Sequence, residues 1–341
     1  MGRGRFIRRG QAGFSLLELL IVVSILSAAA YVALDAVDHD SSELRFNLTE
    51  TRLKTIRRAI VGDPNITVNG SPMISGYAAD VGQLPPCLNA LSVQTSVCGP
   101  GLDDDINPPA YGPRVIDDTD GDGVADDGEA VYLMFGWNGP YVTGLNGTLQ
   151  DAWGNSGTAF AATAGDPDVE AGWIVTPGAA TFDVSSAGRD RVSDADGGGG
   201  AFFDADETMV PIQSADFQVS LAGWTGSVDF TNLTAADVAV CIGLLGVTST
   251  DEDQWAILPN SGAVATVTVG ATQTISFTGV AGDLSSIGKR TLLVFTPDTG
   301  TTCALSGTAI DLPATVFAQE NVVLAPRITL ADVGLSVSVG P

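Results

Sequence analysis

Histidine is almost absent from this chain of 341 residues, which contains one, His39. Serine–histidine–aspartate catalysis needs a histidine beside the nucleophile, and zinc sites use histidines or closely spaced cysteines. His39 lies among acidic residues after a long apolar run, so neither chemistry is expected. Gly288-Lys289-Arg290 also lacks the glycine spacing and the serine or threonine of a phosphate-binding loop. We therefore predict that the protein is not an enzyme.

Basic residues are scarce as well, with 15 lysines and arginines against 40 aspartates and glutamates and a formal net charge of −25. Nucleic acids and anionic membrane surfaces attract a basic face, so neither is an expected partner. Charged residues make up only 16% of the chain, which contains 41 glycines and 17 prolines. This balance favours β-rich modules with many loops, and the length suits one helix with two globular domains.

Cysteine is limited to four residues, none of them in a CxxC motif. Cys87 and Cys98 form one pair by spacing, and Cys241 and Cys303 form another. In an oxidising compartment the first disulfide contributes roughly 3 kcal/mol by closing a short loop, and the second somewhat more. The alternative is four free buried thiols.

A long uncharged run, Leu19 to Leu34, dominates the amino-terminal region. The arginines before it have no acidic neighbours, which predicts that this end stays in the cytoplasm. Residues 14–34 reach the roughly 20 residues that a helix needs to cross a bilayer. Two alternatives remain: a secretory signal peptide cleaved after the alanines at 28–30, before Tyr31, or an ordinary single-pass anchor.

Glu18 is the unusual residue of this segment. A carboxylate at the start of a membrane helix costs about 2.5–3.5 kcal/mol on insertion scales, so it needs a role. Neither a signal peptide nor an ordinary anchor supplies one. Glu18 therefore counts against both alternatives.

The segment from Gly13 to Val23, Gly-Phe-Ser-Leu-Leu-Glu-Leu-Leu-Ile-Val-Val, resembles the signal of type IV pilins and of the pseudopilins of type II secretion. The resemblance implies that a prepilin peptidase cleaves after Gly13 and methylates the new amine of Phe14. Glu18 becomes the fifth mature residue, which in that family pairs with the terminal amine of a neighbouring subunit. Such pairing agrees with the physics, because two separated buried charges are costlier than a compensated pair.

Helical spacing continues beyond the apolar run, and neither proline nor glycine interrupts residues 14–61. We predict one long helix over 14–62, with its second half packed on a globular head. An amphipathic linker or a coiled coil is the alternative. The residues that recur at helical spacing are Leu44, Leu48, Leu53, Ile56 and Ile60.

Two tryptophan segments, Trp137–Tyr141 and Asp151–Asn155, resemble the Trp-x-Gly-Pro-Tyr and Asp-Pro-Trp-Gly-Asn segments of major pseudopilin heads. The chain differs from that pattern at Ala152, where proline is frequent, and at Ser156-Gly157, where Pro-Tyr is usual. Their physical role is packing, with the tryptophans holding a small sheet against the helix.

An acidic loop at 118–129 has the strongest metal-binding pattern. Its carboxylates, one carbonyl and a glycine at the sixth position match the twelve-residue calcium loop. Prolines before the loop argue against an entering helix, so we predict a structural calcium site rather than a sensor. A solvated acidic turn is the alternative. The predicted ligands are Asp118, Asp120, Asp122, Val124, Asp126 and Glu129.

A second acidic cluster follows Ser186-Ala187-Gly188. Asp190, Asp194 and Asp196 loosely match the segment that leads into a calcium site in major pseudopilins. Arg189 and Arg191 lie in the same loop and offer the alternative of a salt-bridged turn without metal. Asp204 and Asp206 are further candidate ligands.

The chain changes character after four glycines at 197–200, which predict a flexible joint. Short β-type runs then recur between turn residues, as in a β-sandwich. The resemblance covers roughly residues 1–207. We predict a leader over 1–13, the helix over 14–62, a head over 63–207 and a sandwich-like all-β domain over 208–341.

The predicted fold class is α+β: a long amino-terminal transmembrane and filament-core helix on a small antiparallel head, followed by the all-β domain. The expected function is a structural subunit of a type II secretion pseudopilus or type IV pilus-like filament, with calcium stabilising the head. Expected partners are other pilin or pseudopilin subunits, the prepilin peptidase and the inner-membrane assembly platform. The chain would sit in the inner membrane before assembly and in a periplasmic or extracellular filament afterwards.

Two other functions fit the same residues. The first is a minor pilin or adhesin whose carboxy-terminal domain binds a surface or ligand. The second is a soluble calcium-binding protein with a cleaved signal peptide.

Overall fold

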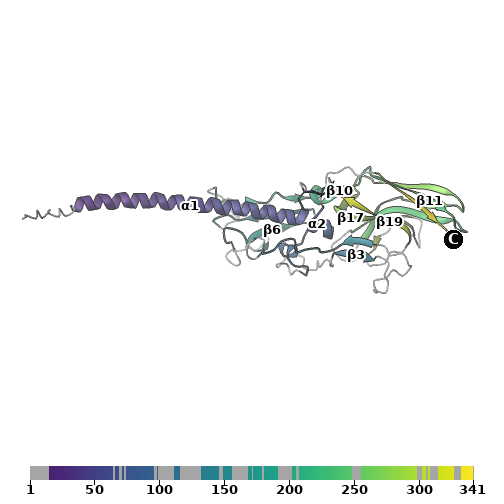
Figure 1. The fold of residues 1–341 in the computed structure, drawn as a ribbon, viewed down its shortest axis with the longest axis horizontal. Helices are drawn as coiled ribbons and strands as arrows, with labels where there is room; N and C mark the ends of the chain where they lie inside the picture. The colour runs from purple at the N-terminus through teal and green to yellow at the C-terminus, as the bar shows by residue number, and fades with distance from the viewer. Residues whose placement is uncertain are drawn as a thin grey trace, which may run out of the picture.

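The computed structural model places a long helix at one end of an elongated molecule and two β-sheets at the other (Figure 1). The described residues are 15–63, 66–68, 71–72, 74–95, 98, 111–115, 132–145, 149–155, 168–170, 172–178, 180–190, 202–204, 207–247, 255–297, 302–304, 306–307, 314–325 and 332–340.

Helix α1 (Leu16–Val61) confirms the predicted long helix. Ser15 begins the helix with a capping box. Its side chain accepts from the backbone N–H of Glu18, and the Glu18 side chain accepts from the backbone N–H of Ser15. Gly62 ends it at φ +76°, where a Cβ would lie 2.5 Å from the carbonyl oxygen of Ser75. At 1.5 Å per residue, α1 is about 69 Å long.

The head, which we define as the described residues from 66 to 213, packs against one side of the carboxy-terminal half of α1 (Figure 1). One stripe of α1 is buried there, at spacings of three, four or seven residues, which keep the side chains on a single helix face. The stripe contains Ser42, Thr49, Leu53, Ile56, Ala59 and Ile60.

The head contains two short helices and small antiparallel sheets. Strand order in its largest sheet is β5-β6-β7-β8, with β9 also pairing with β7. That sheet consists of β5 (Asp168–Glu170), β6 (Trp173–Pro177), β7 (Thr181–Ser186), β8 (Glu207–Thr208) and β9 (Ile212–Gln213). The other elements are β1 (Thr67–Val68), β2 (Ser71–Pro72), α2 (Tyr77–Val81), a 3-10 helix (Leu88–Leu91), β3 (Gly112–Val115) and β4 (Tyr132–Phe135).

The distal region, which we define as the described residues from 214 to 340, contains a three-stranded sheet and a six-stranded sheet. The three-stranded sheet has the order β15-β11-β20, and the other has the order β18-β13-β12-β17-β19 with β14 on β12. Their strands are β11 (Thr225–Asn232), β12 (Val238–Val247), β13 (Trp255–Asn260), β14 (Ala265–Val267), β15 (Thr272–Thr278), β17 (Gly288–Pro297), β18 (Ser306–Gly307), β19 (Ala314–Leu324) and β20 (Val333–Val339). The distal region also contains helix α3 (Ser214–Phe217), which contacts β9 of the head, and the antiparallel pair of β10 (Gln218–Ser220) and β16 (Leu284–Ser286).

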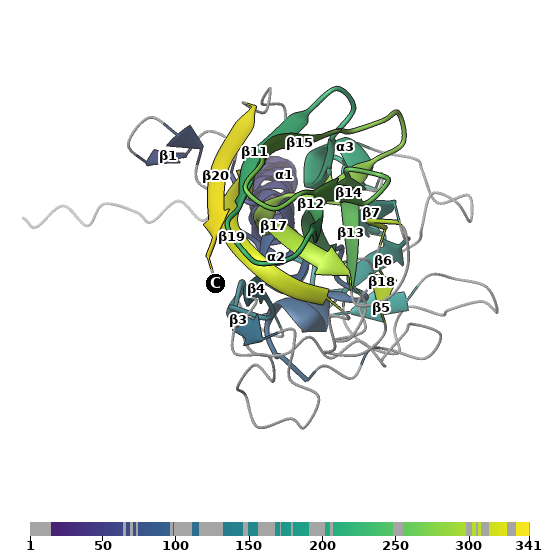
Figure 2. The ribbon, with the colours of Figure 1, turned by 90° about the vertical axis from the view of Figure 1, so that its right-hand side faces the viewer.

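These two sheets pack against each other (Figure 2). The ring of Phe230 on β11 lies 5.2 Å from that of Phe317 on β19, measured between centroids. Buried and exposed residues alternate along β11, as expected for a strand with one face on a core. The α+β prediction is therefore confirmed, with the long helix and many antiparallel strands in one chain.

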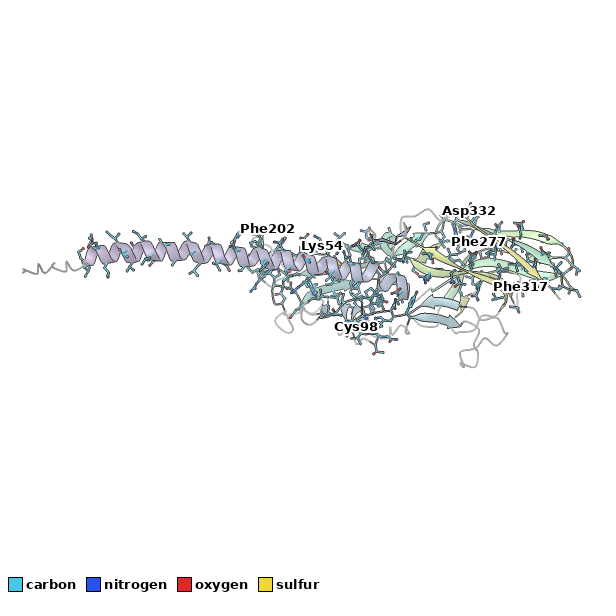
Figure 3. All side chains as sticks on the ribbon, in the orientation of Figure 1. Lys54, Cys98, Phe202, Phe277, Phe317 and Asp332 are labelled. Carbon is cyan, nitrogen blue, oxygen red and sulfur yellow. A yellow bond between two sulfur atoms is a disulfide. The ribbon has the colours of Figure 1, made fainter. Side chains whose placement is uncertain are left out.

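Both predicted disulfides are present in the structure. Cys87 and Cys98 have a Cα–Cα distance of 5.8 Å, and Cys241 and Cys303 one of 5.6 Å. Figure 3 labels Cys98 in the head. All four cysteines are bonded, so none is a free thiol.

The core is continuous from α1 to the distal region. Buried apolar side chains from Leu53 to Leu324 form one cluster. Arg57 of α1 contributes to this junction, because it donates to the carbonyl of Val210 at 3.2 Å and pairs with Asp216 at 3.0 Å. Strands β8 and β9 lie at and beyond the predicted boundary between 207 and 208, and both pair with β7. The division into domains stays a prediction.

Candidate functional site

The amino-terminal half of α1 is a bare apolar rod. No residue from Ser15 to Ser41 is buried, and α1 is the one helix of the described residues that is long and apolar enough to span a membrane. Leu16 is 82% exposed and Tyr31 is 74% exposed. Such a surface requires lipid or other helices around it, because apolar area in water is unfavourable. The large apolar side chains that are exposed on it include Leu16, Leu17, Leu20, Ile25, Leu26, Tyr31, Val32 and Leu34.

Glu18 lies at the free end of this rod. The backbone N–H of Ser15 donates to Glu18 Oε2 at 3.3 Å, and the N–H of Glu18 donates to Ser15 Oγ at 3.1 Å. The carboxylate is therefore held at the helix amino terminus, where the helix dipole favours negative charge. Gly13 and Phe14 lie outside the described residues, so the predicted cleavage and amine pairing stay predictions.

Asp151 joins the head to α1 and begins the second tryptophan segment. Its side chain is 2% exposed, and its Oδ1 accepts from Ser186 Oγ at 3.0 Å and from Thr49 Oγ1 at 3.4 Å. Its Oδ2 accepts from the amide of Asn155. Burial raises the pKa of Asp151, and these hydrogen bonds oppose the rise. One carboxylate thus connects α1, β7 and the segment at 151–155.

Trp153 connects the same segment to β8. Its indole N–H donates to Glu207 Oε1 at 3.1 Å. Burial raises the pKa of the Glu207 carboxyl to about 7, the bond from Trp153 lowers it, and the charges of Asp151 and Glu50 raise it further. The second oxygen of Glu207 is buried with no hydrogen-bond partner among the described residues. Glu207 is therefore suited to carry a proton near neutral pH.

The first tryptophan segment connects α2 to the 3-10 helix. Trp137 donates from Nε1 to the carbonyl of Ala90 at 2.9 Å, and the hydroxyl of Tyr141 donates to Asp80 Oδ2 at 3.0 Å. The rings of Trp137 and Tyr77 each meet that of Tyr141 edge to face. Both segments thus have the packing role that the sequence indicates.

The predicted calcium loop, with Asp118, Asp120, Asp122, Val124, Asp126 and Glu129, lies outside the described residues. In the second predicted cluster Asp190 is described, whereas Asp194 and Asp196 are not. Arg189 pairs with Asp204 at 2.8 Å and lies 4.0 Å from Asp38. The choice between a metal ion and a salt-bridged turn at this cluster stays a prediction. Within the described ranges no group of three or more histidine, cysteine or acidic residues is placed to hold a metal ion.

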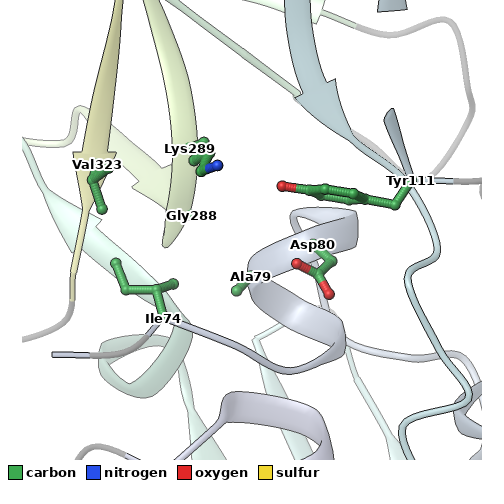
Figure 4. A pocket seen from close by; sticks show the side chains of 7 residues that line it. All are labelled: Ile74, Ala79, Asp80, Tyr111, Gly288, Lys289 and Val323. Carbon is green, nitrogen blue, oxygen red and sulfur yellow. The ribbon is translucent and has the colours of Figure 1, made fainter. Parts of the chain in front are cut away.

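Sequence reasoning missed a cavity of about 180 Å³ where α2 meets β17 (Figure 4). Behind it lies Arg290, 0% exposed, whose guanidinium donates to the carbonyls of Lys289 and Ile287 at 2.7 and 2.9 Å. Burial lowers the pKa of Arg290 to about 10, while Tyr111 and Asp80 raise it. The sequence feature that pointed to this contact between α2 and β17 was Arg290, a charged residue within an otherwise apolar strand. The cavity is lined by Ile74, Ala79, Asp80, Tyr111, Gly288, Lys289 and Val323.

Comparison with known proteins identifies the amino-terminal segment. Residues 8–31 match the family model described as the prokaryotic N-terminal methylation motif. No curated protein and no solved structure matches the chain. The chain thus combines a prepilin-type motif with a long apolar helix, as in type IV pilin-like proteins.

The motif also defines what the segment does in general terms. It supports a pilin-like or pseudopilin-like protein, and it implies processing by a peptidase and polymerisation of the pilin type. The exposed apolar half of α1 fits anchoring in a membrane before assembly.

Proposed function

We propose that the protein is a structural subunit of a type II secretion pseudopilus or of a related type IV pilus-like filament. The observation that carries this proposal is the division of α1 into two halves. The half with the methylation motif has no buried residue between 15 and 41, whereas the other half is part of the core. In a soluble secreted protein most of the first half would be removed as a signal peptide, and Glu18 would then have no role.

Assembly exchanges one apolar environment for another. Before assembly the bare half of α1 lies in the inner membrane, with the arginine-rich leader in the cytoplasm. The prepilin peptidase cleaves after Gly13 and methylates Phe14. In the filament the same apolar surface packs on other subunits, delivered by the inner-membrane assembly platform. Homo- and hetero-polymers both satisfy this requirement.

Glu18 favours the movement of the subunit from the membrane into the filament. Its carboxylate meets the amine of Phe14 on a neighbouring subunit, so the charge is compensated in the filament and less well compensated in lipid. Pairing one end of each helix with one position on the next also defines the axial register. Calcium at the 118–129 loop would neutralise its carboxylates and hold the turns of that loop in one conformation.

The experiment combines amino-terminal mass spectrometry with filament imaging. We expect the mature chain to begin at Phe14 in the wild type and in Glu18→Ala, and filaments to be lost in the variant. Glu43→Ala is the matched control, because Glu43 is an exposed acid of the same helix outside the apolar run. A mature chain beginning at Tyr31, or normal filaments in Glu18→Ala, would contradict the proposal.

A minor subunit or adhesin is the second candidate, and the placement of the distal region favours it. The two distal sheets lie beyond the carboxy-terminal end of α1, along the helix axis (Figure 1). The next subunit along that axis would collide with these sheets. A subunit of this shape therefore fits best at the end of a filament or at few places within it. Quantifying the chain in sheared filaments separates the two roles. A major subunit dominates the preparation, whereas a minor one is a small fraction of it.

A further inference from the structure

The outer side of the three-stranded sheet in the distal region carries hydroxyl groups in rows. Its outward side chains come from β15, β11 and β20, and all of them are exposed or half-buried. We call this surface the hydroxyl face. It contains Thr272, Thr274, Ser276 and Thr278 of β15, Thr225, Ser227, Asp229 and Thr231 of β11, and Ser336 and Ser338 of β20.

Strand register aligns these side chains into rows across the sheet. Thr231 is opposite Thr272 on one side and Ser338 on the other, and Asp229 is opposite Thr274 and Ser336. Neighbouring strands lie about 4.8 Å apart, and every second residue recurs after about 6.7 Å. Gly334 occupies the β20 position beside Ser227, and a Cβ there would lie 3.9 Å from Ser227 Oγ.

Hydrogen bonds within the hydroxyl face hold its polar groups in place. Thr231 and Thr272 share a bond of 2.9 Å between their hydroxyls, and Thr274 Oγ1 donates to Asp229 Oδ1 at 2.6 Å. Threonine is also restricted at χ1 by its branched Cβ. These four side chains are therefore ordered before any ligand arrives, which lowers the entropic cost of binding.

We propose that the hydroxyl face binds a neutral polysaccharide. Serine, threonine and aspartate offer alternating donors and acceptors that match sugar hydroxyls, and a carboxylate makes strong, charge-assisted bonds to them. Repeated rows on the protein fit a polymer with repeated hydroxyls. An anionic polymer is disfavoured, because the chain has a formal charge of −25 and Asp229 lies at the centre of the face.

A protein partner fits this surface poorly. The hydroxyl face is about 10 Å wide and about 20 Å long, far less than the roughly 800 Å² that each side of a stable protein interface buries. It offers none of the aromatic or aliphatic anchors of an interface centre. A second copy of this chain would bring two Asp229 side chains together, and like charges repel.

The test measures depletion of the full chain, in mild detergent, onto microcrystalline cellulose. We expect saturable binding, about tenfold weaker for Asp229→Ala, because a charge-assisted hydrogen bond is lost. Ser276→Tyr, which breaks the flat surface, should also lose affinity. Thr315→Tyr on β19 is the control, since it places the same ring at an exposed strand position of the other sheet and should bind as the wild type does.

Cellulose phosphate, with the same backbone and added negative charge, should retain less of the wild-type chain. Absence of binding to cellulose, or equal binding by all variants of unchanged melting temperature, overturns the proposal. Thermal hysteresis without cellulose binding would indicate that the hydroxyl face binds ice. Concentration-dependent self-association through the face would indicate that it binds a second copy of the chain. Either result would also overturn the proposal. The unassembled chain is tested, so failure here leaves the filament proposal intact.

Discussion

Trp153 donates its indole N–H to Oε1 of Glu207 over 3.1 Å, although 54 residues separate them in sequence. The bond lies beside Asp151, which itself accepts from Thr49 of α1. A buried acid with a raised pKa, a second buried acid and the membrane-proximal helix therefore share one small volume at the base of the head. The consequences can be tested by pH and by substitution.

Head stability should fall as pH rises from about 4.5 to about 7. Glu207 has a folded-state pKa of about 7 against an ordinary value of 4.5, so the folded state retains its proton after the unfolded state has lost it. The free energy of unfolding therefore decreases as pH rises across that window. Above the window the whole contribution of protonated Glu207 is lost. With allowance for solvent screening, the loss is on the order of 1–2 kcal/mol. Urea unfolding at several pH values measures it.

Glu207→Gln should flatten this dependence, because an amide carries no titrating proton. Asp151, whose pKa burial also raises, contributes a smaller slope in the same direction. Glu43→Gln, which removes an exposed acid of α1, is the control for the loss of one carboxylate. A wild-type stability that rises or stays constant between pH 4.5 and 7 would contradict the assignment.

Thr49→Val should loosen the attachment of α1 to the head. The variant keeps the shape of the side chain but removes a donor to the buried carboxylate of Asp151, which costs about 1–3 kcal/mol. Thr51→Val is the matched control, since the Thr51 hydroxyl is exposed and bonds to Asn47 of its own helix. Thermal unfolding should separate the two variants, and Thr49→Ser should restore most of the loss. Equal melting temperatures for both valine variants would show that the bond adds little.

Gly288→Ala should be the most damaging small substitution at the junction between head and distal region. Gly288 has φ +124°, and a Cβ there would lie 2.3 Å from the carbonyl oxygen of Ala79 on α2. Gly282 has φ +102° with nothing within 4 Å, so Gly282→Ala measures backbone strain alone. We expect about 1–2 kcal/mol for Gly282→Ala and several kcal/mol for Gly288→Ala. Similar losses would mean that α2 and β17 separate easily.

Calcium removal should lower the melting temperature of the wild type. The acidic loop at 118–129 repels itself without an ion, and an ion bound to the native state adds stability by mass action. Asp118→Ala and Glu129→Ala should melt at the same temperature with and without chelator. Calorimetry on the full chain distinguishes this from a solvated turn, for which chelator has no effect on the wild type either.

The sequence was most informative where local rules decide the structure. An unbroken helix over 14–62 follows from the lack of glycine and proline, and it appears as Leu16–Val61. Cysteine spacing predicted both disulfides. Of the β-type runs predicted after residue 200, the one at 217–221 appears as β10 (Gln218–Ser220), while Phe217 ends the preceding helical turn α3, in which Asp216 accepts from the backbone of Gln213.

Long-range pairing could not be predicted from the sequence. Parallel β11 and β20 are separated by about 100 residues, and nothing in either strand specifies the other. The same is true of Asp80 and Arg290, which influence each other only because α2 packs on β17. Within the candidate site, the amino-terminal motif could be predicted because all of its residues lie in one short segment. The hydroxyl face required the register of three strands.

The unbroken course of α1 has a mechanical consequence. Without a glycine or proline between residues 16 and 61, the helix has no hinge at the point where the head begins. A tilt of its bare half therefore swings the whole molecule as a lever, and the displacement grows with distance from the pivot. The sheets beyond the far end of α1 move furthest, so small reorientations at the base sweep them through a wide arc.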